Sequence, residues 1–183
     1  LVRSRGLGDV YKRQVMTSYA LEEADTPVEV FEACRAFCSE MCDDPDCRDT
    51  VIYGGNNWYY AYGKSSAKEI LGDSAYLAEM TEGIENRPFM VMDDGWQIDH
   101  SDSYNGGPWR VGNADYGDMG ELAAQMRAKN VRPGIWFRPL YDHSADIPAE
   151  WRLERNAEVF DISVPEVLEH IAQDIRQLGD WGY

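Results

Sequence analysis

The sequence of 183 residues contains no apolar run approaching the ~20 residues that a membrane-spanning helix needs, so no membrane partner is expected. Basic residues are also few, because 17 Lys and Arg stand against 33 Asp and Glu, a net charge of −16. Nucleic-acid binding requires clustered positive charge. The excess of acidic residues therefore argues against a nucleic-acid partner.

Cysteine is scarce, and its spacing does not favour a metal site. Cys34, Cys38 and Cys42 recur every four residues of a predicted helix, and Cys47 follows a proline. Structural zinc usually takes pairs of ligands on turns rather than three on one helix. We therefore expect small buried residues on an outer helix, with a metal or cluster as the alternative and no cofactor. Free thiols favour a reducing, cytoplasmic location.

Aromatic residues, in contrast, are plentiful, with six Trp and eleven Tyr. Aromatic faces at the mouth of a pocket are a common means of holding sugar rings, although many of these residues are expected in the core.

Residues 1–14 (LVRSRGLGDVYKRQ) differ in character from the rest, being net basic and lacking an initial Met. They resemble a translated sequencing adapter and are expected to be disordered. The alternative is a disordered basic arm, and the fold prediction concerns residues 15–183.

The hydrophobic pattern predicts alternating strands and helices. Helices are expected over 27–42, 67–82, 119–129 and 164–178, and strands over 50–53, 88–92, 134–137 and 159–162. Thr26 and Ser163 are the expected caps of the first and last helices. Strands that are apolar on both faces indicate a parallel sheet covered by helices.

The fold class is thus α/β, and we interpret it as an incomplete (β/α)8 TIM barrel containing about the first three βα units. The chain is expected to stop before the fourth strand, because the last predicted helix leads only to Trp181-Gly182-Tyr183. A doubly wound nucleotide-binding sheet is the alternative. It is disfavoured because the turn Gly54-Gly55-Asn56-Asn57 lacks the glycine spacing of a phosphate loop, and Trp58 would obstruct a pyrophosphate.

Polar and aromatic residues follow each predicted strand, where barrel enzymes carry their sites. The candidate substrate-binding residues are Asn57, Trp58, Asp93, Asp94, Trp96, Trp136 and Arg138. Amide and carboxylate groups hydrogen-bond to hydroxyls, and indole rings offer an apolar face to a sugar. Three strand ends that carry the same kinds of residue indicate a binding site more strongly than any single motif does.

The adjacent carboxylates Asp93 and Asp94 are the sharpest feature. Consecutive residues of a strand point to opposite sides, so both can face one site only if the backbone turns sharply, and Gly95 permits such a turn. The alternatives are a capping turn and, more weakly, a divalent metal site with Asp99 or His100. His143 and Asp161 also follow strands, but a solvated loop histidine and a helix-capping aspartate explain them as well.

Several segments resemble glycoside hydrolase family 36, the α-galactosidases and raffinose-type enzymes. The segment Val91-Met92-Asp93-Asp94-Gly95-Trp96-Gln97 is similar to a family signature, and Gly134-Ile135-Trp136-Phe137-Arg138-Pro139 to its Gly-Ile-Trp-Phe-Glu-Pro block. The segment 160–167 resembles the element before the nucleophile strand, and Trp181-Gly182-Tyr183 the approach to that strand. The resemblance covers residues 49–183.

The resemblance implies a retaining hydrolase of α-galactosides or related α-glycosides. By resemblance, Asp93 and Asp94 bind the 4- and 6-hydroxyls of galactose, and Trp58 and Trp136 line the sugar subsite. The nucleophile and the acid/base are expected beyond Tyr183, so the chain alone should be inactive. Alternatives are a raffinose-synthase-like glycosyltransferase and a non-catalytic carbohydrate-binding protein. Homo-oligomers of the full-length enzyme are allowed for, with the oligomeric state left open.

Arg138 departs from the family pattern, which often has Glu after Trp-Phe. A guanidinium there could recognise a carboxylate or a differently placed hydroxyl, which puts galactose specificity in doubt. A structural ion pair is the alternative role for Arg138.

Overall fold

The computed structural model describes residues 2–6, 14–18, 26–41 and 50–183. Contacts divide the chain into two units, Leu1–Asp49 and Thr50–Tyr183. None of the described helices is long and apolar enough to span a membrane.

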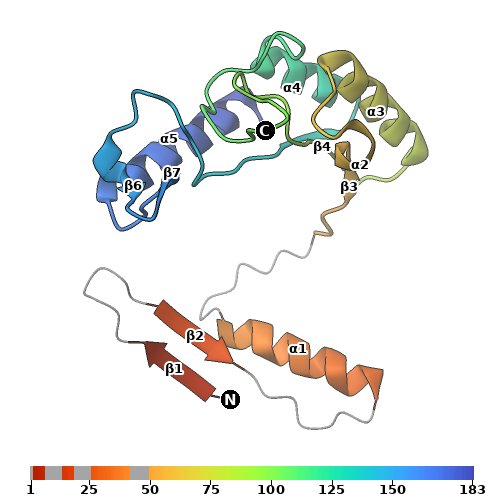
Figure 1. The fold of residues 1–183 in the computed structure, drawn as a ribbon. Coiled ribbons are helices and arrows are strands. Elements are labelled where there is room, and N and C mark those ends of the chain that lie inside the picture. The colour runs from red at the N-terminus through yellow and green to blue at the C-terminus, as the bar shows by residue number, and fades with distance from the viewer. Residues whose placement is uncertain (1, 7–13, 19–25, 42–49) are drawn as a thin grey trace. The chain divides into compact units, whose positions relative to one another are not determined.

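Among its described residues, the first unit contains a pair of strands and one helix (Figure 1). Strands β1 (Val2–Gly6) and β2 (Gln14–Ser18) pair antiparallel, so part of the stretch expected to be disordered forms a strand. Its origin as an adapter stays a prediction. Helix α1 (Pro27–Met41) begins as predicted, with a reciprocal cap in which Glu29 N donates to Thr26 Oγ1 and Thr26 N to Glu29 Oε2.

The expected burial of the cysteines on α1 is wrong for Cys34, which is exposed. Phe31 on the same helix is also exposed, at 64% of its surface. Cys42 and Cys47 lie outside the described residues, and only the backbone of Cys38 is described. Among the described residues, no group of three His, Cys, Asp or Glu side chains is placed to hold a metal ion.

The second unit is built on a parallel sheet of three strands in the order β3-β4-β5. Its strands are β3 (Gly54–Asn56), β4 (Phe89–Met92) and β5 (Arg132–Ile135), and its helices are α2 (Trp58–Ala61), α3 (Ala67–Met80), α4 (Met119–Ala128) and α5 (Pro165–Trp181). A 3-10 turn (Ala149–Trp151) and the antiparallel strands β6 (Arg152–Leu153) and β7 (Asn156–Phe160) precede α5. The predicted α/β class and parallel sheet are confirmed, whereas a closed barrel is not present.

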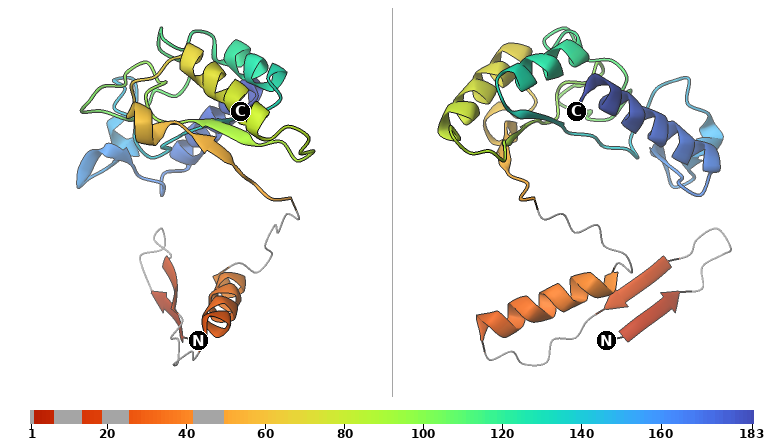
Figure 2. Two further views of the ribbon diagram at one scale, coloured as in Figure 1. Left: turned by 90° about the vertical axis from the view of Figure 1, so that its right-hand side faces the viewer. Right: turned by 180° about the vertical axis from the view of Figure 1, so that it is seen from behind.

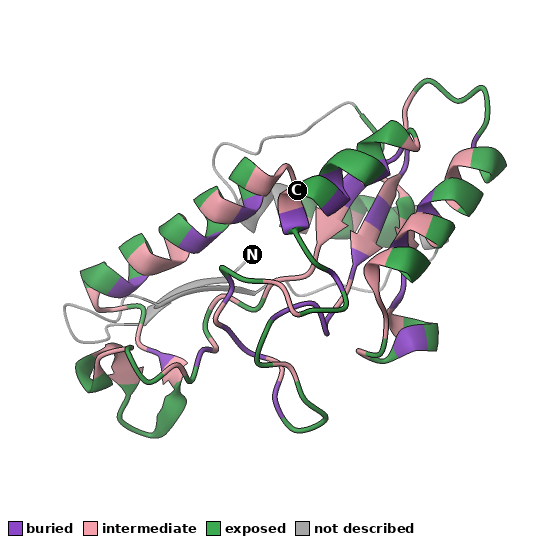
Figure 3. Cartoon of the chain, turned by 90° about the horizontal axis from the view of Figure 1, so that it is seen from above, coloured by how far each residue is buried: buried purple, intermediate pink, exposed green. Residues whose placement is uncertain are grey.

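Helices α3 and α4 lie on one face of this sheet (Figures 1 and 2). Met90 and Met92 of β4 are buried and belong to the same apolar core as Ile70 of α3 and Met126 of α4. Phe89 and Val91, which point to the opposite face, are only partly buried. Figure 3 shows buried, intermediate and exposed residues following one another along the helices of the second unit.

The strand boundaries differ from the prediction at both outer strands. The first strand lies at Gly54–Asn56, which had been predicted as the turn that ends it. Pairing with Phe89–Val91 determines this register, and a Cβ on Gly54 would lie 1.8 Å from the carbonyl oxygen of Phe89. Only glycine therefore fits, so this residue serves close strand approach rather than a turn. The third strand likewise begins at Arg132 rather than at Gly134.

The last helix also begins one residue later than predicted. Val164, not Ser163, is the N-cap residue of α5, and it makes no side-chain cap hydrogen bond. Ser163 instead donates through its backbone N and Oγ to Asp161 Oδ1, at 2.9 and 2.6 Å. Asp161 thus organises the turn before the helix, while Pro165 occupies the first turn as predicted.

Candidate functional site

The carboxyl ends of β3 and β4 meet in a polar cluster of four residues, Asn56, Asn57, Asp93 and Asp94, here called the strand-end cluster. Asn56 Nδ2 donates to Asp93 Oδ2 at 2.6 Å, and Asn57 Oδ1 accepts from Asp93 N at 2.8 Å. Asp94 N donates to Asp93 Oδ1 at 2.7 Å. The sequence predicted that these strand ends come together, and the structure places them in direct contact.

Asp94 is held separately from Asp93. It is only 4% exposed, and its Oδ1 accepts from Gln97 Nε2 at 2.7 Å. His100 Nδ1 lies 3.3 Å from the same oxygen, as an ion-pair contact outside good hydrogen-bond geometry. Gln97 Oε1 in turn accepts from Gly95 N at 3.1 Å. The carboxylate of Asp94 is thereby fixed by the turn that it begins.

Gly95 makes this turn in a conformation open only to glycine. Its φ is +112°, and a Cβ there would lie 2.4 Å from the carbonyl oxygen of Gly63. The sharp turn that the sequence required after the two aspartates is therefore present. It brings the Asp94 loop against the residues that follow α2.

A cavity of about 280 Å³ opens beside Asp94, here called the Trp58 cavity. Trp58 of α2 and Tyr62, the C-cap residue of this helix, line one side with ring centroids 5.7 Å apart, and residues 100–105 line the other. Small-molecule sites usually measure ~300–1,000 Å³ and combine apolar walls with a few polar groups. An indole face, a buried carboxylate and hydroxyl groups make this cavity suited to a small polyhydroxy ligand.

Arg138 contacts a residue that lines the Trp58 cavity. Its Nη1 donates to Asn105 Oδ1 at 2.5 Å, and its guanidinium stacks over Tyr141 at 4.1 Å. Asn105 lines the cavity, so Arg138 positions one of its walls. Arg138 thus contacts an amide and an aromatic ring here, rather than the carboxylate that the alternative of a structural ion pair requires.

Two predicted sugar-binding tryptophans lie elsewhere. Trp96 is 0% exposed, packing against Trp109 and Trp181, and its Nε1 donates to the carbonyl oxygen of Trp136. A ring without exposed surface cannot stack on a ligand, so the assignment of Trp96 does not fit this structure. Trp136 is partly buried against the same core and does not line the Trp58 cavity.

Three residues that shape this site were not predicted for that role. Gln97 is fully buried and holds Asp94, and His100 was named only as a weak metal-ligand candidate. Tyr104 stacks on His143 at 3.5 Å, accepts from His143 N and donates to the carbonyl oxygen of Gly107. The only signal for Gln97 was its place in the aspartate motif, three residues after Asp94.

Burial raises the pKa of Tyr104 to about 12, with Asp142 adding to the rise and the hydrogen bond from His143 N opposing it. The protonated phenol is thus favoured by folding. This contribution to stability is complete below the ordinary tyrosine pKa near 10 and is lost as the pH rises through about 12.

We expect the stability advantage of the wild type over Tyr104→Phe to shrink between pH 10 and pH 12. Chemical denaturation of both proteins across this range measures it, and a matching ultraviolet titration should lack one late tyrosinate in the variant. An advantage that stays constant or grows with pH would contradict the assignment.

Comparison with solved structures gives the following likenesses. An α-galactosidase from Thermus thermophilus, in complex with p-nitrophenyl α-D-galactopyranoside, matches with a TM-score of 0.59 and 23% identity, over 85% of this chain and 33% of that chain. The galactosidase domain of an α-galactosidase–sucrose kinase matches at 0.62 and 22%, over 74% and 20%. A family GH36 α-galactosidase from Geobacillus stearothermophilus matches at 0.56 and 23%, over 73% and 20%.

The chain has the fold of part of these α-galactosidases. These structures confirm, at the level of the fold, the resemblance inferred from the motifs. Sequence identities below 25% show a shared fold alone. The chain spans about a fifth to a third of the length of these structures. No protein-family model and no curated protein matches the sequence.

Proposed function

We propose that this chain forms the sugar-binding part of a retaining glycosidase that acts on α-galactosides or related α-glycosides. The observation that carries the proposal is the strand-end cluster, with Asp94 buried at the wall of a cavity that Trp58 also lines. The neighbouring structures of the same fold include complexes with p-nitrophenyl α-D-galactopyranoside and with stachyose. Asp93, Asp94 and Trp58 are the proposed sugar contacts, with Asn57 positioning Asp93.

The one-sided helix layer supports a barrel as the parent architecture. In a (β/α)8 barrel the helices lie outside the strands, and the inner face of the sheet is filled by side chains of the other strands. The sheet β3-β4-β5 runs in sequence order and has α3 and α4 on the same face (Figure 1). A doubly wound sheet would be covered on both faces.

A retaining glycosidase requires two carboxyl groups about 5–5.5 Å apart, one as nucleophile and one as acid/base. We propose that neither belongs to residues 1–183. Asp93 accepts hydrogen bonds at both oxygens from Asn56 and from the backbone of Asp94, which suits a fixed binding group better than a nucleophile. The chain alone is therefore expected to release no p-nitrophenol from p-nitrophenyl α-D-galactopyranoside.

Removing the indole of Trp58 tests the binding part of the proposal. We expect Trp58→Ala to weaken binding of that galactoside by about 5–30-fold, because truncation of an aromatic anchor costs ~1–2 kcal/mol. Isothermal titration calorimetry on the full chain measures the change. Tyr76→Ala is the matched control, since Tyr76 lies on α3 with 65% of its surface exposed. Equal affinities of the two variants would count against the Trp58 cavity.

A further inference from the structure

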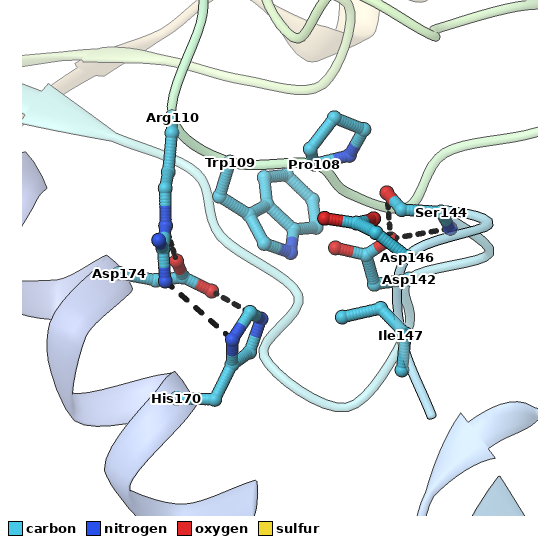
Figure 4. Close-up of a pocket in the computed structure, with 9 residues that line it drawn as sticks. All are labelled: Pro108, Trp109, Arg110, Asp142, Ser144, Asp146, Ile147, His170 and Asp174. Atoms are coloured by element: carbon cyan, nitrogen blue, oxygen red, sulfur yellow. Dashed lines mark hydrogen bonds and ion pairs between the residues drawn. The ribbon is translucent and has the colours of Figure 1, made fainter. Parts of the chain in front are cut away.

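A second cavity lies between the loop at 108–110, the loop at 142–147 and helix α5 (Figure 4). Its volume is about 80 Å³, and it shares no lining residue with the Trp58 cavity. We call it the Trp109 cavity. At ~10–15 Å³ for each buried water, it has room for about five to eight such positions, and so for more than one solvent molecule.

Two buried donors in this cavity have no hydrogen-bond partner. Trp109 is 1% exposed, and its Nε1 is unpartnered although indole N–H groups are normally satisfied when buried. His170 Nε2 is buried and makes no hydrogen bond, although it lies 3.5 Å from Asp174 Oδ2. Arg110 Nη2 lies 3.5 Å from His170 Nδ1, and since a guanidinium can only donate, this contact favours the tautomer in which Nε2 carries the proton.

Carboxylates stand opposite these donors. Asp142 is 2% exposed, and its Oδ1 accepts from Ser144 N and Oγ at 2.8 and 2.5 Å, which fixes the side chain. A Cβ placed on Gly107 would lie 2.4 Å from Asp142 Oδ2 and 2.8 Å from Trp109 Nε1, so both atoms border the same small volume. Figure 4 shows the indole nitrogen on the side of Asp142.

The charges of the lining decide which ligand fits. Asp142, Asp146 and Asp174 oppose the single guanidinium of Arg110, which is bound to Asp174 at 2.8 Å. An anion would satisfy both donors but be repelled by three carboxylates. A bare cation would suit the carboxylates but leave the indole N–H of Trp109 without an acceptor. A hydroxyl group both accepts and donates, and so meets both demands.

We propose that the Trp109 cavity binds a neutral ligand through adjacent hydroxyl groups. One hydroxyl accepts from Trp109 Nε1 and donates to Asp142 Oδ2, and its neighbour accepts from His170 Nε2. The ligand class is a small polyol or one unit of a saccharide, since both present the same hydroxyl pair. The assignment uses neither Asp93 nor Asp94 and is independent of the proposed function.

The indole proton of Trp109 reports directly on this site. In ¹⁵N-labelled full chain, with the signal assigned through Trp109→Phe, titration with erythritol and with methyl α-D-galactopyranoside should shift this signal saturably. A response to erythritol only indicates a small polyol, and a response to the galactoside only indicates a sugar unit. The diol 1,4-butanediol, which lacks adjacent hydroxyl groups, is expected to give no saturable shift.

Substitutions separate this site from the Trp58 cavity. Asp142→Asn should weaken the response by about tenfold or more, because the acceptor of a charge-assisted hydrogen bond is lost. Asp180→Asn, at an exposed position of α5, and Asp94→Asn should leave it unchanged. Ile147→Trp narrows the cavity without altering its polar groups and should also abolish the response. This second variant tests the site even if Asp142→Asn does not fold.

Three results would overturn the proposal. The first is no saturable shift with either ligand, including the case in which only a long-lived water contacts the indole proton. The second is an equal response to 1,4-butanediol. The third is a response that persists in both Asp142→Asn and Ile147→Trp.

Discussion

Replacing Gly95 with alanine is expected to destabilise the unit Thr50–Tyr183 by about 3 kcal/mol or more. A non-glycine residue held at a positive φ costs ~1–3 kcal/mol, and here φ is +112°. The added Cβ would also lie 2.4 Å from the carbonyl oxygen of Gly63, a backbone atom that cannot move aside without shifting its segment. Because the Asp94 loop packs on that segment, the Trp58 cavity should be lost as well.

Gly83→Ala is the matched control for this prediction. Gly83 has φ +79°, but a Cβ there would meet nothing within 4 Å, so only the conformational cost remains, about 1 kcal/mol. Urea denaturation of the two variants and the wild type measures the difference. If Gly95→Ala costs no more than Gly83→Ala, close packing of the two loops does not contribute to the stability of the site.

The second large effect is expected for Asp94→Asn, which should weaken binding of p-nitrophenyl α-D-galactopyranoside by about 10–100-fold. A hydrogen bond to a charged acceptor contributes ~1.5–3 kcal/mol, and a 4% exposed carboxylate meets little competition from water. The asparagine keeps the shape of the side chain and the oxygen that accepts from Gln97 Nε2. Loss of affinity would then reflect the charge rather than a rearranged loop.

Calorimetric titration measures this effect, with Asp180→Asn as the exposed-carboxylate control. Thermal unfolding of both variants shows whether the loop is intact. An Asp94→Asn protein that folds normally and binds like the wild type would remove Asp94 from the sugar contacts.

Hydrophobic pattern was enough to predict helices α3 and α4 and the central strand of the second unit, but not the short helix α2. The segments Ala67–Met80, Phe89–Met92 and Met119–Ala128 lie within two residues of their predicted bounds. The outer strands were misplaced because pairing, not local pattern, determines them. Gly54–Asn56 has no strand propensity of its own and is extended because it pairs with Phe89–Val91.

The site could be predicted as a set of strand ends, but not as a set of contacts. Parallel strands bring Asn56, Asn57 and Asp93 together by topology alone. Which tryptophan faces a ligand depends on tertiary packing, since Trp58 and Trp96 both follow a strand closely. Trp181 and Trp109 enclose Trp96, four residues after β4, whereas Trp58, two residues after β3, borders a cavity.

The contacts of Tyr104 and Gln97 could not be predicted from the sequence either. Tyr104 stands in no pattern that signals a site, and Gln97 only in the aspartate motif, because their roles come from partners far along the chain or from one loop conformation. Tyr104 connects the loop before Trp109 with His143, and Gln97 acts only because Gly95 turns the chain back on Asp94.

The most direct test of the central claim is a ¹⁵N NMR titration of the full chain with p-nitrophenyl α-D-galactopyranoside. If sugar binds at these strand ends, we expect saturable shifts of the Trp58 indole signal and of the backbone amides of Asp93 and Asp94, with no shift of the buried Trp96 indole. Saturable shifts that leave Trp58, Asp93 and Asp94 unaffected, or no saturable shift anywhere, would contradict a sugar site at these strand ends.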